Sequence, residues 1–143
     1  MSNQPSRPQI PPDMKAFNQK VIEEFRANEG QLSGPMAGRQ VLLLTTTGAK
    51  SRVLRTVVVG YRADGDRWLA IASNNGNDAE PAWYRNLRGD PSATIEVGPD
   101  RIQVRARTAA VSERAALAAK IEYLERQEAL TKRQIPIVIF ERA

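Results

Sequence analysis

Apolar side chains near the start of the chain recur at helical spacing. The positions that form this stripe are Met14, Phe17, Val21, Ile22 and Phe25. Their spacing predicts an amphipathic helix, with Asp13 as a candidate N-cap and Gly30 as a candidate C-terminal residue. Acids and bases flank the stripe, so we expect this helix to pack on the body of the protein, with a membrane-surface helix as the alternative.

The rest of the chain contains short β-branched runs separated by turn residues, which predict strands. Six strands are expected, over residues 41–47, 56–62, 67–73, 93–97, 101–108 and 135–140. The turn at Asp64 and Gly65 predicts that the second and third of these form a hairpin. Because the strands are mostly adjacent in sequence, we expect an antiparallel sheet or a small barrel with peripheral helices.

Two further helices are expected in the second half of the chain. Pro81 suits the first turn of a short helix that ends near Leu87. Ser112 is a candidate N-cap for a long helix over residues 113–130, a segment rich in Ala, Leu, Glu and Arg. Residues 1–12 are rich in proline and polar residues, which predicts a flexible arm before a single domain over residues 13–143.

The chain of 143 residues contains neither cysteine nor histidine. This composition excludes disulfides, thiolate and imidazole catalysis, and haem held by an axial His or Cys, and we expect no metal site. Redox chemistry would then come from a bound cofactor. No apolar run reaches the roughly 18 residues of a membrane span, and residues 1–12 lack the apolar core of a signal peptide. We therefore expect a cytoplasmic protein, with a peripheral position at the inner membrane face as the alternative.

Positive charge is concentrated in one part of a chain whose net charge is +5. No acidic residue lies between residues 29 and 64, whereas Lys50, Arg52 and Arg55 share one predicted loop. Like charges this close repel one another unless an anion lies among them. Small neighbouring residues allow backbone N–H groups to approach a phosphate. The loop therefore predicts an anion site, with a solvated basic hairpin as the alternative.

Aromatic residues near a basic loop also suit nucleic-acid binding through base stacking. Trp83, however, follows Pro81 inside the apolar segment AWYRNL, where packing in the core is the usual role. The sequence contains no nucleic-acid-binding motif that we can identify. We therefore expect no nucleic-acid partner.

Four blocks resemble one known family in order and spacing: VLLLTTTGAKSRVLRTVVVG, AIASNNG, PAWYRNL and IPIVIF. They are similar to the deazaflavin-dependent nitroreductases, small actinobacterial reductases that use coenzyme F420. The opening FNQKVIEEFRANEG is also similar, so the resemblance covers about residues 17–140. It implies an α+β, mainly β fold, the split β-barrel of flavin-binding proteins. It also implies hydride transfer from reduced F420 to an electron-poor acceptor.

Matching positions in these blocks imply the cofactor contacts. In the family a basic loop cradles the cofactor phosphate and runs under the ring, a small-residue segment follows the pyrimidine edge, and a helix closes over the phosphate. The implied contacts are Ala49, Lys50, Ser51, Arg52, Arg55, Thr56, Val57, Ala72, Ser73, Asn74, Trp83, Tyr84 and Asn86. Many relatives have Gly, Pro and Lys where this chain has Arg52, Leu54 and Asn74. We expect these departures to change affinity rather than the identity of the ligand.

The C-terminal helix is the substrate-facing element of the family. Here it carries Tyr123 among Ile121, Leu124 and Leu130, which favours flat hydrophobic acceptors. Tyr123 is the candidate for substrate contact or proton donation, and a partly exposed helix residue is the alternative. The acceptors that we expect are activated C=C bonds, as in unsaturated lactones and coumarins, or nitroaromatics or quinones.

Two alternatives keep the fold and change the function. The phosphate of FMN would also suit the basic loop, so an FMN-dependent oxidoreductase of the same fold is one alternative. The other is a non-catalytic carrier of F420 or of a lipid-like ligand. The sequence is compatible with a monomer or a homodimer.

Overall fold

The computed structural model describes residues 14–143, so the expected arm and the candidate cap Asp13 lie outside the described residues. The helices are α1 (Met14–Ala27), α2 (Ala82–Gly89), α3 (Val111–Ala118) and α4 (Leu124–Glu128), with short 3-10 turns η1 (Gly34–Met36) and η2 (Asn74–Gly76). The strands are β1 (Val41–Thr47), β2 (Leu54–Gly60), β3 (Arg62–Asp64), β4 (Arg67–Ile71), β5 (Ser92–Val97), β6 (Asp100–Thr108) and β7 (Ile137–Arg142).

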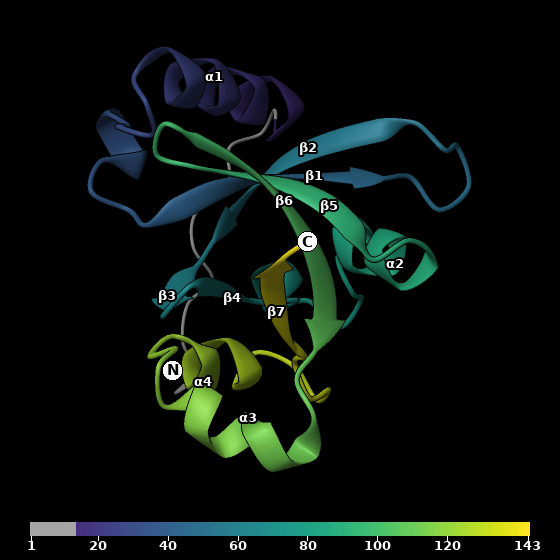
Figure 1. Cartoon of the computed structure of the whole chain (residues 1–143). Helices are drawn as coiled ribbons and strands as arrows, with labels where there is room; N and C mark the ends of the chain where they lie inside the picture. The colour runs from purple at the N-terminus through teal and green to yellow at the C-terminus, as the bar shows by residue number, and fades with distance from the viewer. Residues whose placement is uncertain (1–13) are drawn as a thin grey trace.

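The seven strands form one sheet in the order β2-β1-β5-β6-β7-β4-β3. Every neighbouring pair is antiparallel. β2 and β3 follow one another in sequence yet lie at the two edges of the sheet, so the sheet curls and brings its edges toward each other (Figure 1). The expected mainly antiparallel fold with peripheral helices is confirmed, with seven strands where six were predicted.

The single strand expected over residues 56–62 is wrong. β2 starts at Leu54, pairs with β1 along its whole length and ends at Gly60. Only the short β3 pairs with β4, around the expected turn at Gly65, so the hairpin exists with a much shorter first strand. The residues of this run favour strand structure throughout, so propensity does not mark a boundary within it. The boundary lies where the chain stops pairing with β1 and starts pairing with β4. β4 also ends earlier than expected, at Ile71.

The single helix expected over residues 113–130 is also wrong. α3 ends at Ala118, and the amides of Lys120 and Ile121 bond to carbonyls three residues back, which tightens the chain before α4 begins. The helix start differs as well. The Glu113 carboxylate accepts a hydrogen bond from the amide of Ala110 at 2.9 Å, and Ser112 lies inside α3 rather than at its N-cap.

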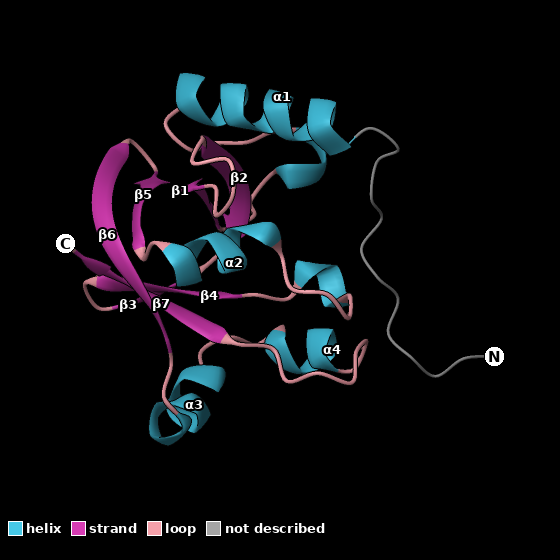
Figure 2. Cartoon of the chain, turned by 90° about the vertical axis from the view of Figure 1, so that its right-hand side faces the viewer, coloured by secondary structure: helices cyan, strands magenta, loops and turns pink. Residues whose placement is uncertain are grey.

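The helices cover opposite ends of the sheet. Figures 1 and 2 both place α1 at one end and α3 with α4 at the other. Ile22 and Phe25 of α1 are buried against Leu43 of β1, so the expected packing of this helix on the body is confirmed. α1 ends three residues before Gly30, which has φ +91°, and a Cβ there would lie 2.8 Å from the Cα of Gly98. No helix of the described part is long and apolar enough to cross a bilayer.

Candidate active site

A cavity of about 600 Å³ lies against the outer edge of β2. Its walls come from residues 57–60 of β2, residues 73–75 after β4 and residues 81–83 at the start of α2. β2 is an edge strand, so the backbone groups on its outer side pair with no other strand of the described sheet. An apolar wall with free N–H and C=O groups suits a flat heterocycle that has both hydrogen-bond donors and acceptors at its rim. We call this space the edge-strand cavity.

The loop between β1 and β2 adjoins α2 and is held by Asn86. The buried Asn86 side chain accepts a hydrogen bond from the amide of Ala49 at 3.0 Å and donates one to Thr46 Oγ1 at 3.1 Å. Gly48 closes the loop, because a Cβ there would lie 2.4 Å from Ser51 Oγ. The loop that the sequence marks as an anion site is therefore fastened at its base to the helix beside it.

The three cations expected at this loop are all exposed. Within residues 14–143, none of Lys50, Arg52 and Arg55 forms an ion pair. Arg52 has φ +61°, the left-handed conformation that favours glycine, so an arginine here adopts a turn that glycine would adopt more readily. Unpaired cations on a fastened loop form a suitable site for a phosphate.

The structure brings some of the predicted contact residues to the edge-strand cavity and places others elsewhere. Those that line it are Val57, Ser73, Asn74 and Trp83. Those on the adjoining loop or strand are Ala49, Lys50, Ser51, Arg52, Arg55 and Thr56. Ala72 is fully buried, and Tyr84 is a core residue whose hydroxyl lies 2.7 Å from Thr108 Oγ1. Tyr84 and Asn86 therefore do not line this cavity, and Asn86 acts on the loop.

Arg133, which the sequence analysis missed, fixes the wall after β4. Its Nη2 donates to the carbonyls of Ala72 and Ser73, both at 2.9 Å, and its Nε donates to that of Asn77 at 3.0 Å. The segment it holds includes Asn75, with φ +55°. Nothing in the sequence around Arg133 indicates this role, because the carbonyls that it binds are distant along the chain.

Tyr123 lies at one end of the edge-strand cavity, just before α4. Its hydroxyl is buried and has no hydrogen-bond partner in the described part of the chain. Burial raises the pKa of this hydroxyl above its ordinary value of 10, and the charge of Arg62 offsets this only in part. The guanidinium carbon of Arg62 lies 4.7 Å from the centre of the ring. Tyr123 therefore keeps its proton at neutral pH and has a hydrogen bond to offer.

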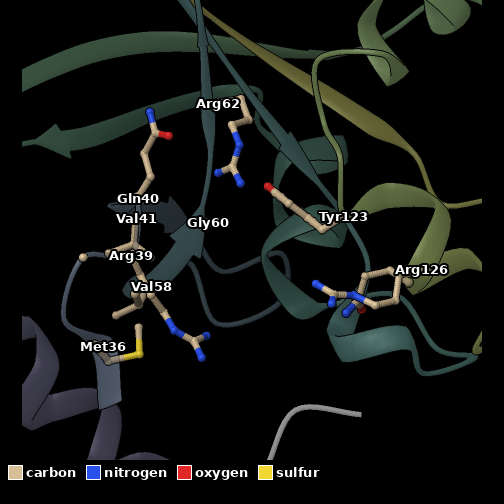
Figure 3. Close-up of a pocket in the computed structure, with 11 residues that line it drawn as sticks. Met36, Arg39, Gln40, Val41, Val58, Gly60, Arg62, Tyr123 and Arg126 are labelled. Atoms are coloured by element: carbon tan, nitrogen blue, oxygen red, sulfur yellow. The ribbon is translucent and has the colours of Figure 1, made fainter. Parts of the chain in front are cut away.

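A second cavity, of about 720 Å³, continues past Tyr123 and shares Val58 and Gly60 with the first (Figure 3). Gly60 lies beside Tyr123 at the junction, since a Cβ there would lie 3.7 Å from the Tyr123 hydroxyl, an ordinary van der Waals contact.

The site fits a flat, polar-edged cofactor with an anionic extension. Two buried polar atoms of the edge-strand cavity wall, Asn75 Nδ2 and Tyr123 Oη, lack partners within the described residues. The basic loop adds unpaired positive charge beside it. No group of acidic side chains in the described part is arranged to hold a metal ion.

Comparison with known sequences identifies the family. The family model for F420H(2)-dependent quinone reductases matches residues 18–142. An F420H(2)-dependent quinone reductase of Mycobacterium tuberculosis is 40% identical over 84 residues, which cover 58% of this chain and 56% of that protein. The match thus spans little more than half the length of that relative. A second M. tuberculosis protein, whose name places it in the same family, is 33% identical over 68% of this chain and 86% of its own.

Solved structures agree with this assignment. An F420-H2 dependent reductase is 32% identical with a TM-score of 0.61, over 72% of this chain and 95% of that one. A chain described as a domain-swapped dimer is 26% identical with a TM-score of 0.66, over 86% and 93%. An FAD-binding protein of Mesorhizobium loti, 12% identical with a TM-score of 0.53 over 87% and 85%, shows the fold alone. The expected split barrel is confirmed. The cavity at the free edge of β2 and the basic loop beside it are consistent with the family match over residues 18–142. The chain belongs to the F420H(2)-dependent quinone reductase family.

Proposed function

We propose that this protein is a reductase that uses reduced coenzyme F420 to reduce a quinone or a similar flat, electron-poor acceptor. The observation that carries this proposal is the edge-strand cavity beside a loop with unpaired cations, Lys50, Arg52 and Arg55, in a chain of this family. The cavity suits the deazaflavin ring. The loop suits the phosphodiester that follows the ring in the cofactor.

Reduced F420 supplies a hydride from the carbon that stands where flavins have their central reactive nitrogen. The chain's own residues bind and orient. The cations and amides of the basic loop would hold the phosphate. The free edge of β2 and the segment fixed by Arg133 would hold the rim of the ring. Holding donor and acceptor about 3–3.5 Å apart in aligned geometry is the main contribution that such a protein makes to hydride transfer.

Tyr123 is the residue that we place against the acceptor. Hydride addition to a quinone leaves a hydroquinone monoanion, which must then take up one proton. The protonated Tyr123 hydroxyl, buried and without a partner in the described part of the chain, donates a hydrogen bond to the oxygen on which this charge develops. Solvent supplies the proton directly or through Tyr123.

The proposal is tested by mixing the protein anaerobically with reduced F420 and menadione and following the return of oxidised deazaflavin. We expect turnover, and we expect the double variant Lys50→Gln/Arg55→Gln to raise KM for reduced F420 by about tenfold or more, because charge-assisted bonds to the phosphate are lost. Arg101→Gln, at an exposed position of β6, is the matched control and should leave KM unchanged. Failure to oxidise reduced F420 with each of the three acceptor classes, quinones, nitroaromatics and unsaturated lactones, would contradict the proposal.

A further inference from the structure

The lining of the second cavity includes Arg39, Arg62 and Arg126 and none of the residues of the basic loop, and we call it the arginine cavity. We propose that it binds an anionic group of the acceptor, so that the preferred acceptors are flat molecules that carry a carboxylate. This inference rests on the proposed function, because it names the substrate class of the same site.

The arginine cavity has an unbalanced charge. Its lining includes three arginines and, among the residues that the structure describes, no carboxylate. Arg39 approaches from the segment before β1, Arg62 from β3 and Arg126 from α4 (Figure 3). Guanidinium groups from three separate elements therefore face one space. Arg62 is paired with Glu122, so the charges left without a carboxylate are those of Arg39 and Arg126, and an anion between them relieves their repulsion.

Two of the three guanidinium groups are available for a ligand. Arg62 is ion-paired with Glu122 and donates to the carbonyl of Tyr61 at 2.8 Å, so it is committed to the protein. Within residues 14–143, Arg39 and Arg126 have no ion-pair partner. A guanidinium presents a planar set of N–H donors that matches a carboxylate. Arg39 and Arg126 are thus the groups that we expect to contact the anion.

The lining also supplies what the rest of an acceptor needs. Met36 and Val41 are apolar, which suits the contact with a flat ring. A volume of about 720 Å³ lies within the usual range for small-molecule sites. An acceptor ring next to Tyr123 can therefore place an appended carboxylate in the arginine cavity without leaving the hydride donor.

The order of features along β2 assigns this anion to the acceptor rather than to the cofactor. The basic loop precedes β2 at Leu54, the edge-strand cavity begins at Val57, and the arginine cavity meets the strand at Val58 and Gly60. The glutamate tail of F420 is attached beyond the phosphate, on the side away from the ring. A cofactor with its phosphate at the basic loop and its ring in the edge-strand cavity would therefore have its tail attached on the side of the loop opposite to Arg39 and Arg126.

The test compares a naphthoquinone that carries a short carboxyalkyl chain with the methyl ester of the same compound. The two differ in one charge and share the reacting ring. We expect kcat/KM to be about tenfold or more higher for the acid, because charge-assisted bonds form with the acid only. In Arg39→Gln/Arg126→Gln, kcat/KM falls at least about tenfold more for the acid than for the ester. Arg105→Gln, exposed on β6, is the control and keeps the wild-type ratio.

Calorimetry of both quinones with the protein in the absence of cofactor gives a reading independent of turnover. Tighter binding of the acid than of the ester, lost in Arg39→Gln/Arg126→Gln, supports the proposal. Equal binding of acid and ester, or equal losses in the variant, overturns it. If neither quinone is reduced, the proposed function fails, and the calorimetric comparison still decides whether the cavity takes an anion.

A further arm separates the acceptor from the cofactor tail. The wild type and Arg39→Gln/Arg126→Gln are titrated with F420 and with a form of the cofactor that lacks the glutamates. Unchanged affinity for both forms in the variant supports the acceptor as the source of the anion. Weaker binding of the glutamate-bearing form alone would assign the arginines to the tail and overturn the proposal.

Discussion

Arg52 is held in a backbone conformation that an arginine rarely adopts. Its φ of +61° lies in the left-handed region, where a Cβ is crowded by the backbone. The residue is exposed and has no ion-pair partner in the described part of the chain. The amide of Arg52 donates to the carbonyl of Gly48 at 3.0 Å, which helps to hold the turn. Glycine could form the same backbone bond without the strain, so we attribute the arginine here to its charge, at the place where we expect the cofactor phosphate.

Replacing Arg52 with Gly is therefore expected to stabilise the protein by about 1 kcal/mol while weakening its affinity for F420. Urea unfolding measures the first effect and a fluorescence titration the second. Lys50→Gly is the matched control, because Lys50 does not have a positive φ and gains nothing from glycine. Equal losses of stability in both variants would show that the turn is not strained at Arg52.

Asn86 connects the basic loop to α2 through two hydrogen bonds, one to the Ala49 amide and one to Thr46. In Asn86→Ala, partners of the buried amide are left unpaired. We expect a loss of about 1–3 kcal/mol in the free energy of unfolding. F420 affinity should fall as well, because the loop is no longer held. Gln134→Ala removes an exposed amide and serves as the control. An unchanged F420 affinity in a folded Asn86→Ala protein would contradict this role.

The residue types of the site were easier to predict than their roles. The charge of Lys50, Arg52 and Arg55 is visible in the sequence because it stands in an interval without acids. The functions of Asn86 and Arg133 were not visible, because each acts on backbone atoms far away along the chain. Tyr84, which a matching block marks as a cofactor contact, is buried in the core, and its contact with the cofactor stays a prediction.

The division of the C-terminal helix into α3 and α4 shows tertiary contacts overriding helix propensity. The Glu128 carboxylate accepts hydrogen bonds from Arg114 Nη2 at 2.9 Å and from the amide of Ile135 at 2.8 Å. Arg114 also donates to the carbonyl of Ile135 at 2.7 Å. These bonds tie both helices to the segment before β7. They hold α4 in the position that places Tyr123 at the junction of the two cavities.

Glu128→Ala is expected to lower the free energy of unfolding by about 1–3 kcal/mol, because the Arg114 guanidinium and the Ile135 amide lose their acceptor. Glu128→Gln keeps a neutral acceptor and should lose less. Urea unfolding of both variants measures the difference. Near-equal stability of Glu128→Ala and the wild type would contradict a role for this carboxylate in fixing α4.

Strand existence was predictable and strand pairing was not. The alternation of Ile102, Val104 and Ala106 with exposed residues gave β6 correctly, because one face of that strand is buried. Within residues 56–62 no pattern marks the end of one strand and the start of the next. The point at which the chain passes from β2 to β3 depends on which edge of the sheet each half pairs with. That transfer is what leaves the outer edge of β2 free for a ligand.

Ion pairs link the outer surfaces of the barrel and make its stability depend on pH. Arg107 of β6 bonds to Glu113 of α3 and lowers the pKa of that carboxyl from 4.5 to about 2, with a smaller contribution from the Ala110 amide. The folded state therefore favours the ionised carboxylate. Its contribution is present above about pH 4.5 and is lost as the pH falls through about 2.

We expect the difference in stability between the wild type and Glu113→Gln to be largest near neutral pH and to close between about pH 5 and pH 2. Urea midpoints measured across this range show the effect. Glu125→Gln is the control, because Glu125 is exposed and has no ion pair in the described part of the chain, and its difference from the wild type stays constant. Parallel curves for the wild type and Glu113→Gln would exclude a role for this pair.

The whole molecule is a curled sheet with a free edge, a basic loop at one end of that edge and an arginine cavity at the other. The most direct test of this account is an equilibrium titration of the protein with F420 and, separately, with FMN, followed by fluorescence at fixed ionic strength. The account predicts micromolar or tighter binding of F420, weaker binding of FMN, and loss of F420 affinity in Lys50→Gln/Arg55→Gln. Preference for FMN, or binding of neither, would contradict it.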